Sequence, residues 1–168
     1  MSRILVACHS RTGYTRSIGE RLAKRLGADF MPIDFVRPRA GAWGYLRCAW
    51  DALRGIEADL AAPARNPKEY DLLVLGTPVW AGHASSPART FARRFGIDAE
   101  RVALFCTMGG SGATTALAEL QQDLRHTPLA TLAMTDREID TGMVDYKIAS
   151  FANAFGFKIP SPLRAEAA

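Results

Sequence analysis

Five short runs of apolar and β-branched residues alternate along this chain with longer segments of helical period. The runs are Ile4 to Cys8, Phe30 to Phe35, Leu72 to Gly76, Val102 to Cys106 and Leu129 to Met134. Such alternation is typical of a parallel sheet whose strands are joined by helices that cover both faces. The sequence therefore predicts an α/β fold of three layers around a five-stranded parallel sheet.

Four further segments carry apolar residues at helical spacing. The first runs from about Tyr14 to Leu26 and ends at Gly27, a residue type that tolerates a left-handed helix cap. The second begins at Ser86-Pro87, where we expect a capping residue and a proline at the first helical position. The last two are marked by apolar stripes, at Leu117, Leu120 and Leu124 and at Val144, Ile148, Phe151 and Phe155.

The longest connection, from about Val36 to Asp71, contains a further expected helix from Ala42 to Arg54. This helix carries three aromatic residues, Trp43, Tyr45 and Trp50. They either pack on the sheet or form an exposed surface for a partner or a second copy of the chain, since exposed aromatic patches mark contacts. The sequence leaves both interpretations open.

Length and composition bound the class of protein. With 168 residues, 48% hydrophobic and 23% charged, the chain is long enough for one compact domain with a buried core. We expect this domain to span residues 1–157 and the tail, residues 158–168, to be frayed. No apolar run approaches the roughly 20 residues that span a bilayer, and the start lacks the apolar stretch of a secretory signal. We expect a cytoplasmic protein without a membrane span, a monomer or homodimer, with no nucleic-acid partner.

The three cysteines lie far apart at Cys8, Cys48 and Cys106, with no C-x-x-C pair. No histidines accompany them at zinc spacing. We interpret them as buried reduced thiols and expect no metal site.

The loop after the first run combines hydroxyls with a glycine. It reads His9-Ser10-Arg11-Thr12-Gly13-Tyr14-Thr15 and leads directly into a helix. In an open parallel sheet, ligands bind beyond the carboxyl ends of the strands. The hydroxyls can surround an anion while the loop amides and the helix N-terminus point at it. A helix cap would need only one hydroxyl, so the loop predicts a phosphate site.

The loops after the third and fourth runs are also candidates for ligand binding. The former, Gly76 to His83, places Trp80 among small residues, where its indole either offers a flat face to a planar ring or tucks beneath its own loop. Gly82 beside it permits a close backbone approach or a change of peptide orientation. The latter, Thr107 to Gly112, offers backbone donors to a ligand or forms only a tight turn.

Several classes of similar architecture are excluded. The chain has neither a P-loop nor the G-x-G-x-x-G spacing of dinucleotide-binding folds. It lacks the acidic residues that receiver domains place after the first and third strands. It also lacks the arginine that low-molecular-weight phosphatases place six positions after a cysteine, since Cys8 and Cys106 lead to Tyr14 and Gly112.

The motifs resemble those of the flavodoxin family. Ser10-Arg11-Thr12-Gly13-Tyr14-Thr15 matches the family's S/T-x-T-G-x-T phosphate loop, and the segment from Tyr70 to Gly82 is similar to its third strand and ring-binding loop. The resemblance covers nearly the whole chain. It implies a flavodoxin-like three-layer sandwich whose parallel strands lie in the order 2-1-3-4-5.

The resemblance implies non-covalent FMN as the cofactor. The FMN phosphate would bind the amides and hydroxyls of Ser10, Arg11, Thr12, Gly13, Tyr14 and Thr15. The isoalloxazine would lie against Thr77, Pro78, Val79, Trp80, Ala81 and Gly82, with Trp80 stacking on it. The pyrimidine edge would lie near Thr107, Met108, Gly109, Gly110 and Ser111. A peptide carbonyl around Ala81 or Gly82 would accept a hydrogen bond from the reduced ring and stabilise a one-electron state.

The resemblance implies electron transport and leaves its form open. The formal net charge of +4 differs from the acidic surroundings typical of electron-carrier flavodoxins. The third loop also lacks the aromatic residue that commonly covers the outer flavin face. One hypothesis is a one-electron carrier that serves a redox partner protein. A second is an oxidoreductase, an NAD(P)H-dependent flavin or quinone reductase that acts on a small acceptor.

No residue is assigned a catalytic role. In a reductase His9 and His83 could donate a proton, or they are only polar surface. Arg89, Arg93 and Arg94 could receive an acidic partner or a nucleotide phosphate, or they form a solvated helix face. A third hypothesis, outside redox chemistry, is an interaction module that uses the aromatic segment from Trp43 to Trp50.

Overall fold

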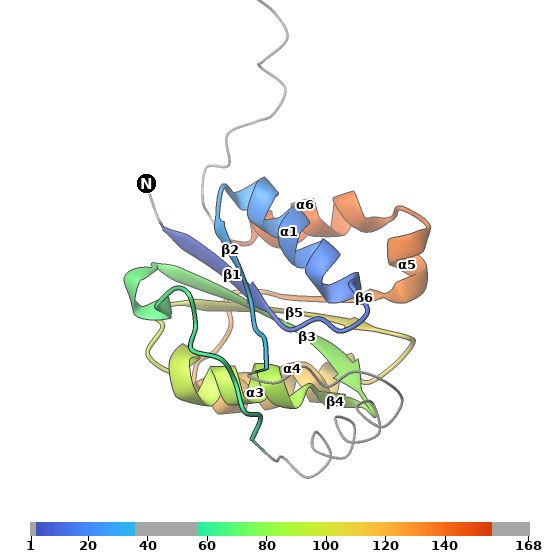
Figure 1. Cartoon of the computed structure of the whole chain (residues 1–168). Coiled ribbons are helices and arrows are strands. Elements are labelled where there is room, and N and C mark those ends of the chain that lie inside the picture. The colour runs from blue at the N-terminus through green and yellow to red at the C-terminus, as the bar shows by residue number, and fades with distance from the viewer. Residues whose placement is uncertain (1–2, 36–56, 156–168) are drawn as a thin grey trace, which may run out of the picture.

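A computed structural model describes residues 3–35 and 57–155, and within them a parallel sheet forms the middle layer (Figure 1). Its parallel strands lie in the order β2-β1-β3-β5-β6, and β4 pairs antiparallel with β3. Their bounds are β1 Ile4–Cys8, β2 Asp29–Pro32, β3 Leu72–Trp80, β4 His83–Ala84, β5 Val102–Met108 and β6 Thr131–Thr135. With the short β4 left out, this is the expected order 2-1-3-4-5, and the expected fold class is confirmed.

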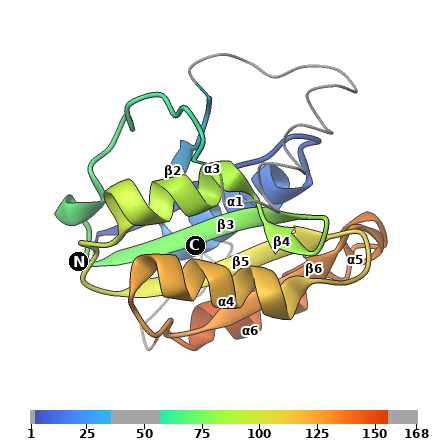
Figure 2. The same ribbon diagram turned by 90° about the horizontal axis from the view of Figure 1, so that it is seen from below.

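Helices cover both faces of the sheet. On one face lie α1 and α6, and on the other α3 and α4, which Figure 2 shows side by side. Their bounds are α1 Tyr14–Leu26, α3 Ser86–Phe91, α4 Ala113–Leu124, α5 Asp136–Asp140 and α6 Val144–Asn153. A π-helical segment, Ala92–Gly96, continues α3, and a short 3-10 turn spans Pro67–Glu69.

The central strands β1, β3 and β5 are buried on both faces, with alternate side chains in two cores. Leu5, Leu73 and Leu104 pack with Phe91 and Leu120 beneath α3 and α4. The strand residues adjacent to these, such as Val6, Val74 and Phe105, pack beneath α1 and α6. There they contact a core that includes Ile18, Leu22, Ile148 and Phe151. Each fully buried side chain of this size contributes on the order of 1.5–3 kcal/mol, so the two cores hold the strand ends in fixed positions.

Some element boundaries differ from those expected. β2 ends at Pro32, not Phe35, because its partner β1 ends at Cys8, the residue paired with Pro32. β3 continues past Gly76 to Trp80, because Thr77 and Pro78 still pair with β5 and the last two residues pair with β4. β6 begins at Thr131 instead of Leu129, which is 45% exposed.

The expected start of α3 is wrong by one residue. Ser85, not Ser86, is its N-cap, and the Ser85 side chain makes no capping hydrogen bond. Proline therefore follows the first helical residue, Ser86, instead of occupying that position. α5 was not expected from the sequence.

Both described cysteines are buried free thiols, as expected. Burial raises the pKa of Cys8 and of Cys106 to about 12, so both stay protonated at neutral pH. Across residues 3–35 and 57–155, no cluster of three or more His, Cys, Asp or Glu is placed to hold a metal ion. No helix of that part of the chain is long and apolar enough to cross a membrane.

Several expectations fall outside the described residues. These are the helix from Ala42 to Arg54 with Trp43, Tyr45 and Trp50, the thiol of Cys48, and the tail 158–168.

Close packing at Gly76 gives a test of the sheet. A Cβ atom at this position of β3 would overlap the buried Phe105 ring of β5. Gly76→Ala should therefore lower the free energy of unfolding by about 1–3 kcal/mol, the usual cost of overpacking a core. Urea unfolding of the FMN-free protein measures the change. Gly109→Ala is the control, since a Cβ atom there meets nothing within 4 Å; equal stability of the two variants would refute the packing assignment.

Candidate functional site

Three loops meet at the carboxyl end of the sheet, because the strands that lead into them are neighbours. These are the first loop, residues 9–13 after β1, the hairpin Val79–Ala84 that β3 forms with β4, and the third loop, residues 109–112 after β5. Pro78 pairs with Thr107 across β3 and β5. The hydroxyls of Thr15 and Thr107 are hydrogen-bonded at 2.8 Å. The residue groups expected to bind the phosphate, the ring and its pyrimidine edge are thus brought together.

The first loop leaves the N-terminus of α1 without a side-chain cap. Gly13 occupies the N-cap position with a φ of 100°, in the left-handed region where glycine is favoured. The hydroxyl of Ser10 accepts a hydrogen bond from the amide of Gly13 at 3.2 Å. The first turn of α1 contains no acidic residue. The loop hydroxyls therefore do not serve as a helix cap, and the amides of the first turn are open to an anion.

The helix α5, unlike α1, has a side-chain cap at its N-terminus. Its N-cap Thr135 and Glu138 form a reciprocal capping box, in which each side chain bonds the other's backbone amide. α4, like α1, begins instead at a left-handed glycine, Gly112, with no side-chain cap and no acid in its first turn. α3 also begins without a side-chain capping bond, at Ser85. What α1 and α4 share is the left-handed glycine at the N-cap position.

Thr15 and Thr107 join the first turn of α1 to the end of β5. Their hydroxyls are buried, with 1% and 3% of each residue exposed. Each hydroxyl carries one hydrogen and can accept as well. When Thr107 donates to Thr15, the hydrogen of Thr15 is left for a ligand oxygen.

The side chains of Arg11, Thr12 and Tyr14 lie outside the core. Arg11 and Thr12 are exposed. The hydroxyl of Tyr14 donates to Asp140 on α5 at 3.3 Å, and the neighbouring carboxylate raises the pKa of Tyr14. A ligand contact from Tyr14 would therefore use its backbone.

The hairpin turns tightly through two left-handed residues. Trp80 pairs with His83, and the intervening Ala81 and Gly82 have φ values of 50° and 85°. This is the backbone of a two-residue type I′ turn. A positive φ at an alanine is a strained conformation that the surrounding structure must hold. Gly112 packs against this turn, since a Cβ atom at Gly112 would lie 2.8 Å from the Cα atom of Gly82.

Thr77 closes the base of the hairpin. It is fully buried, and its hydroxyl accepts from the amide of Ser85 at 2.9 Å and lies 3.0 Å from the Ser85 hydroxyl. Because these bonds occupy the hydroxyl, a ligand contact at Thr77 would come from its backbone. Pro78 and Val79, which follow it, are half-buried.

Trp80 is buried against the first loop and Phe35. Only 6% of it is exposed, and its indole meets the His9 ring edge to face, with ring centroids 5.4 Å apart. Phe35 packs edge to face on the same imidazole at 5.4 Å. The indole is therefore covered, but by side chains of the first loop and by Phe35, whereas the sequence left open ring stacking or burial beneath its own loop. Phe35 therefore lies next to the candidate site. The sequence placed it at the end of an expected strand and did not indicate this contact.

His9 is held as a neutral imidazole. Its Nδ1 lies 2.8 Å from the carbonyl oxygen of Ile33, so this nitrogen carries the hydrogen. Burial lowers the pKa of His9. These contacts indicate that His9 packs against Trp80. They disfavour the role of proton donor that the sequence left open for His9.

His83 is bound to a carboxylate of α4. Its Nδ1 lies 2.7 Å from Oε1 of Glu119, whose Oε2 accepts from the amide of Ala84 at 2.9 Å. Glu119 is thus a functional candidate that no sequence motif marks.

Internal carboxylates pair with all three arginines considered as a phosphate or partner site. Arg89 bonds Asp123 at 2.7 Å, Arg93 bonds Asp123 at 3.2 Å, and Arg94 bonds Glu57 at 2.7 Å. Their positive charge is therefore compensated within the chain.

In the third loop, Gly109, Gly110 and Ser111 are exposed and Met108 is half-buried. Cβ atoms at the two glycines would meet open space, so a planar group can approach this backbone.

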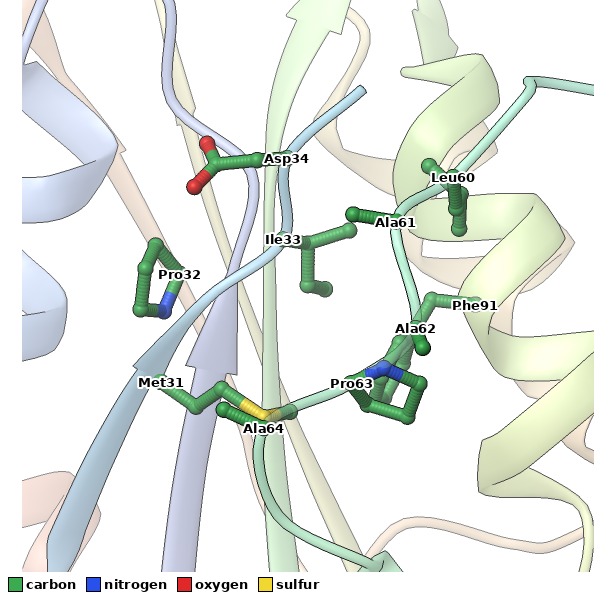
Figure 3. A pocket seen from close by; sticks show the side chains of 10 residues that line it. All are labelled: Met31, Pro32, Ile33, Asp34, Leu60, Ala61, Ala62, Pro63, Ala64 and Phe91. Atoms are coloured by element: carbon green, nitrogen blue, oxygen red, sulfur yellow. The ribbon is translucent and has the colours of Figure 1, made fainter. Parts of the chain in front are cut away.

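A separate cavity of about 150 Å³ lies beside β2 (Figure 3). Its lining is apolar apart from Asp34 and includes Met31, Ile33, Leu60 and Phe91. None of the expected site residues lines it. It is also smaller than the roughly 300–1,000 Å³ of a cofactor pocket.

Comparison with protein families identifies the same pattern. A family model described as flavodoxin matches residues 3–145. No curated protein matches the chain.

Solved structures of similar fold include redox proteins of more than one kind. A flavoprotein from Lactobacillus acidophilus in complex with FMN is 19% identical, with a TM-score of 0.68 over 84% of this chain and 98% of that one. Oxidised flavodoxin 2 from Bacillus cereus is 18% identical, with a TM-score of 0.59 over 92% and 98%. An NADH:FMN oxidoreductase in its apo form is 13% identical, with a TM-score of 0.56 over 92% and 87%. At these identities the likeness shows the fold.

The capping box beside the site gives a pH-dependent prediction. Hydrogen bonds from Lys147 and from the Thr135 amide lower the pKa of Glu138 to about 2 from its ordinary value of 4.5. The stability that the carboxylate contributes is therefore complete above pH 4.5 and is lost as the pH falls towards 2. Urea unfolding should show that Glu138→Gln is less stable than wild type above this range and that the gap closes within it. The exposed control Glu100→Gln should show no such closing gap; a gap for Glu138→Gln that does not change with pH would contradict the assignment.

Proposed function

The chain belongs to the flavodoxin family, and from this premise we propose that it binds FMN non-covalently and transfers electrons through it. The observation that carries the proposal is the uncapped, glycine-led N-terminus of α1, set among loop hydroxyls at the edge where the three loops meet. Helix N-termini of this kind bind phosphate through backbone amides.

In the proposed complex the FMN phosphate binds the amides and hydroxyls of residues 10–15. The buried Thr15 hydroxyl, oriented by Thr107, donates to a phosphate oxygen. The exposed Thr12 supplies a second hydroxyl. Hydrogen bonds to a charged group are among the stronger polar interactions in proteins.

The isoalloxazine lies between the hairpin and the third loop. Ala81 is exposed, as are Gly109, Gly110 and Ser111, so their backbone groups can contact the ring as the protein stands. Stacking on Trp80 would require the indole to leave its contact with His9. The backbone contacts therefore position the ring in the proposal, and stacking on Trp80 stays a prediction.

FMN supplies the redox chemistry when bound, since a flavin accepts and donates electrons. The protein binds the phosphate, orients the ring at the edge of the sheet and keeps the buried His9 neutral beside Trp80. Ala81 and Gly82 hold their turn in a left-handed conformation that presents backbone groups to the ring.

We assign the protein as an electron carrier that serves a redox partner protein. The internal pairing of Arg89, Arg93 and Arg94 favours this role over a reductase, because these cations are not left to bind a nucleotide phosphate. The reductase that uses NAD(P)H and a small acceptor is the second candidate, and the fold is common to both classes.

The phosphate assignment is tested by removing two hydroxyls. The double variant Thr12→Ala/Thr15→Ala loses hydrogen bonds to a charged group, each worth about 1.5–3 kcal/mol, so FMN should bind at least tens-fold more weakly. Fluorescence titration of FMN into the FMN-free protein measures the dissociation constant. Ser150→Ala on the exposed side of α6 is the control. Unchanged FMN affinity in a folded double variant would refute the phosphate site.

The rate at which different electron donors reduce the FMN-loaded protein, measured without oxygen, distinguishes a carrier from a reductase. A carrier should be reduced slowly or not at all by NADH and NADPH, and rapidly by an electron-donor protein such as a ferredoxin reductase. The absorbance of the oxidised flavin follows both reactions. Steady oxidation of NAD(P)H in the presence of a quinone would replace the carrier assignment with the reductase.

A further inference from the structure

Glu119 connects α4 to the hairpin by two hydrogen bonds. One carboxylate oxygen lies 2.7 Å from Nδ1 of His83, and the other accepts from the Ala84 amide at 2.9 Å. These residues lie 36 and 35 positions away in sequence. One side chain thus fixes both an imidazole and a backbone amide on the strand that leaves the turn.

The turn needs such support. β4 has only two residues, so the hairpin is short, and an isolated hairpin is marginally stable. The turn also holds Ala81 at a φ of 50°, a conformation that alanine adopts only under constraint. Thr77 closes the base of the hairpin and Gly112 packs on Gly82, but neither bonds His83 or Ala84. Glu119 is the side chain that bonds both of these residues in the described part of the chain.

Neighbouring charges hold the Glu119 carboxylate in place. Arg89 lies 3.3 Å from its Oε1, and Arg89 is in turn bonded to Asp123 at 2.7 Å. The side chains of Glu119, Arg89 and Asp123 are 16%, 17% and 9% exposed, so water screens these pairs less than it would at the surface. The carboxylate oxygen Oε1, held by Arg89, accepts the hydrogen on Nδ1 of His83.

This bond sets which nitrogen of His83 carries the hydrogen. A neutral imidazole has one donor nitrogen and one acceptor nitrogen, and a carboxylate at one of them selects the tautomer. In the neutral ring, with Nδ1 donating to Glu119, Nε2 is the acceptor. The His83 side chain is 30% exposed.

We propose that Glu119 is a positioning residue for the flavin: it holds the Trp80–His83 turn and the His83 tautomer in the form that meets the isoalloxazine. The inference rests on the proposed function, because it assumes that this hairpin contacts FMN. Backbone groups fixed in advance bind without an ordering cost, so the affinity for FMN and the potential of the bound flavin depend on Glu119. A residue that served stability alone would affect neither.

Three variants and a control test the proposal. Glu119→Gln keeps the shape but has a single oxygen acceptor for two donors, so one of the two bonds is lost. His83→Gln removes the imidazole and leaves the bonds of Glu119 to Ala84 and Arg89. The double variant shows whether Glu119 acts through His83. Glu100→Gln removes the same charge at an exposed position just before β5.

The FMN-free proteins are measured first. Nitrogen-15 chemical shifts of the His83 ring should show hydrogen on Nδ1 in wild type and in Glu100→Gln, and a changed tautomer mixture in Glu119→Gln. Thermal unfolding shows which variants fold. If Glu119→Gln does not fold, His83→Gln carries the test. A wild-type His83 ring with hydrogen on Nε2 and none on Nδ1 would overturn the proposal, and this measurement needs no cofactor.

FMN affinity and midpoint potential are measured next. We expect Glu119→Gln and His83→Gln each to bind FMN about tenfold more weakly, the loss of roughly one charge-assisted hydrogen bond, and to shift the potential. The double variant should bind no more than about twofold more weakly than either single variant, because both remove one linkage. Glu100→Gln should match wild type. Wild-type affinity and potential in folded Glu119→Gln and His83→Gln would overturn the positioning role, whereas a wild-type protein that binds no FMN would refute the proposed function itself.

Discussion

The absence of a side-chain cap on α1 is the constraint on which the candidate site depends. Gly13 supplies the left-handed turn into the helix but has no side chain to bond the first amides. The hydrogen bond from the Gly13 amide to the Ser10 hydroxyl, 3.2 Å long, lies outside the helix. Elsewhere the chain does cap a helix fully, with Thr135 and Glu138 on α5. The first amides of α1 therefore have no side-chain cap, and in the proposed complex they bind the phosphate. This N-terminus lies beside β3 because β1 and β3 are neighbours in the sheet.

The second requirement of the site is a hairpin held in a strained turn. Ala81 and Gly82 are both left-handed, and the two strands that carry them pair over only two residue positions. Three contacts support the turn. Thr77 bonds Ser85 at the base of the hairpin, Gly112 packs against Gly82, and Glu119 of α4 bonds His83 of β4. The third loop and α4 thus hold the hairpin in place, which reduces the ordering cost of binding.

The spacing of apolar residues and the position of glycines predicted those elements whose ends depend on residues close in sequence. β1 and α1 begin and end where apolar runs, helical spacing and the glycine at 27 placed them. The end of β3 could not be predicted, because its last residues are strand only through pairing with β4 and β5. The three candidate loops were predicted from hydroxyls and glycines after strands, and the structure brings them to one edge of the sheet. The Glu119–His83 bond was not, since a glutamate in mid-helix has no motif and its partner lies 36 residues away. The covered indole of Trp80 depends likewise on His9, which lies in the first loop.

A comparison of FMN with riboflavin tests the central claim most directly, because the two ligands share the ring and differ in the phosphate. Titration of each into the FMN-free protein gives two dissociation constants. Two or more hydrogen bonds from the α1 N-terminus and its hydroxyls to the phosphate should make FMN bind at least about a hundredfold more tightly. Equal affinity for the two ligands would contradict the account, because the uncapped helix would then contribute nothing to binding.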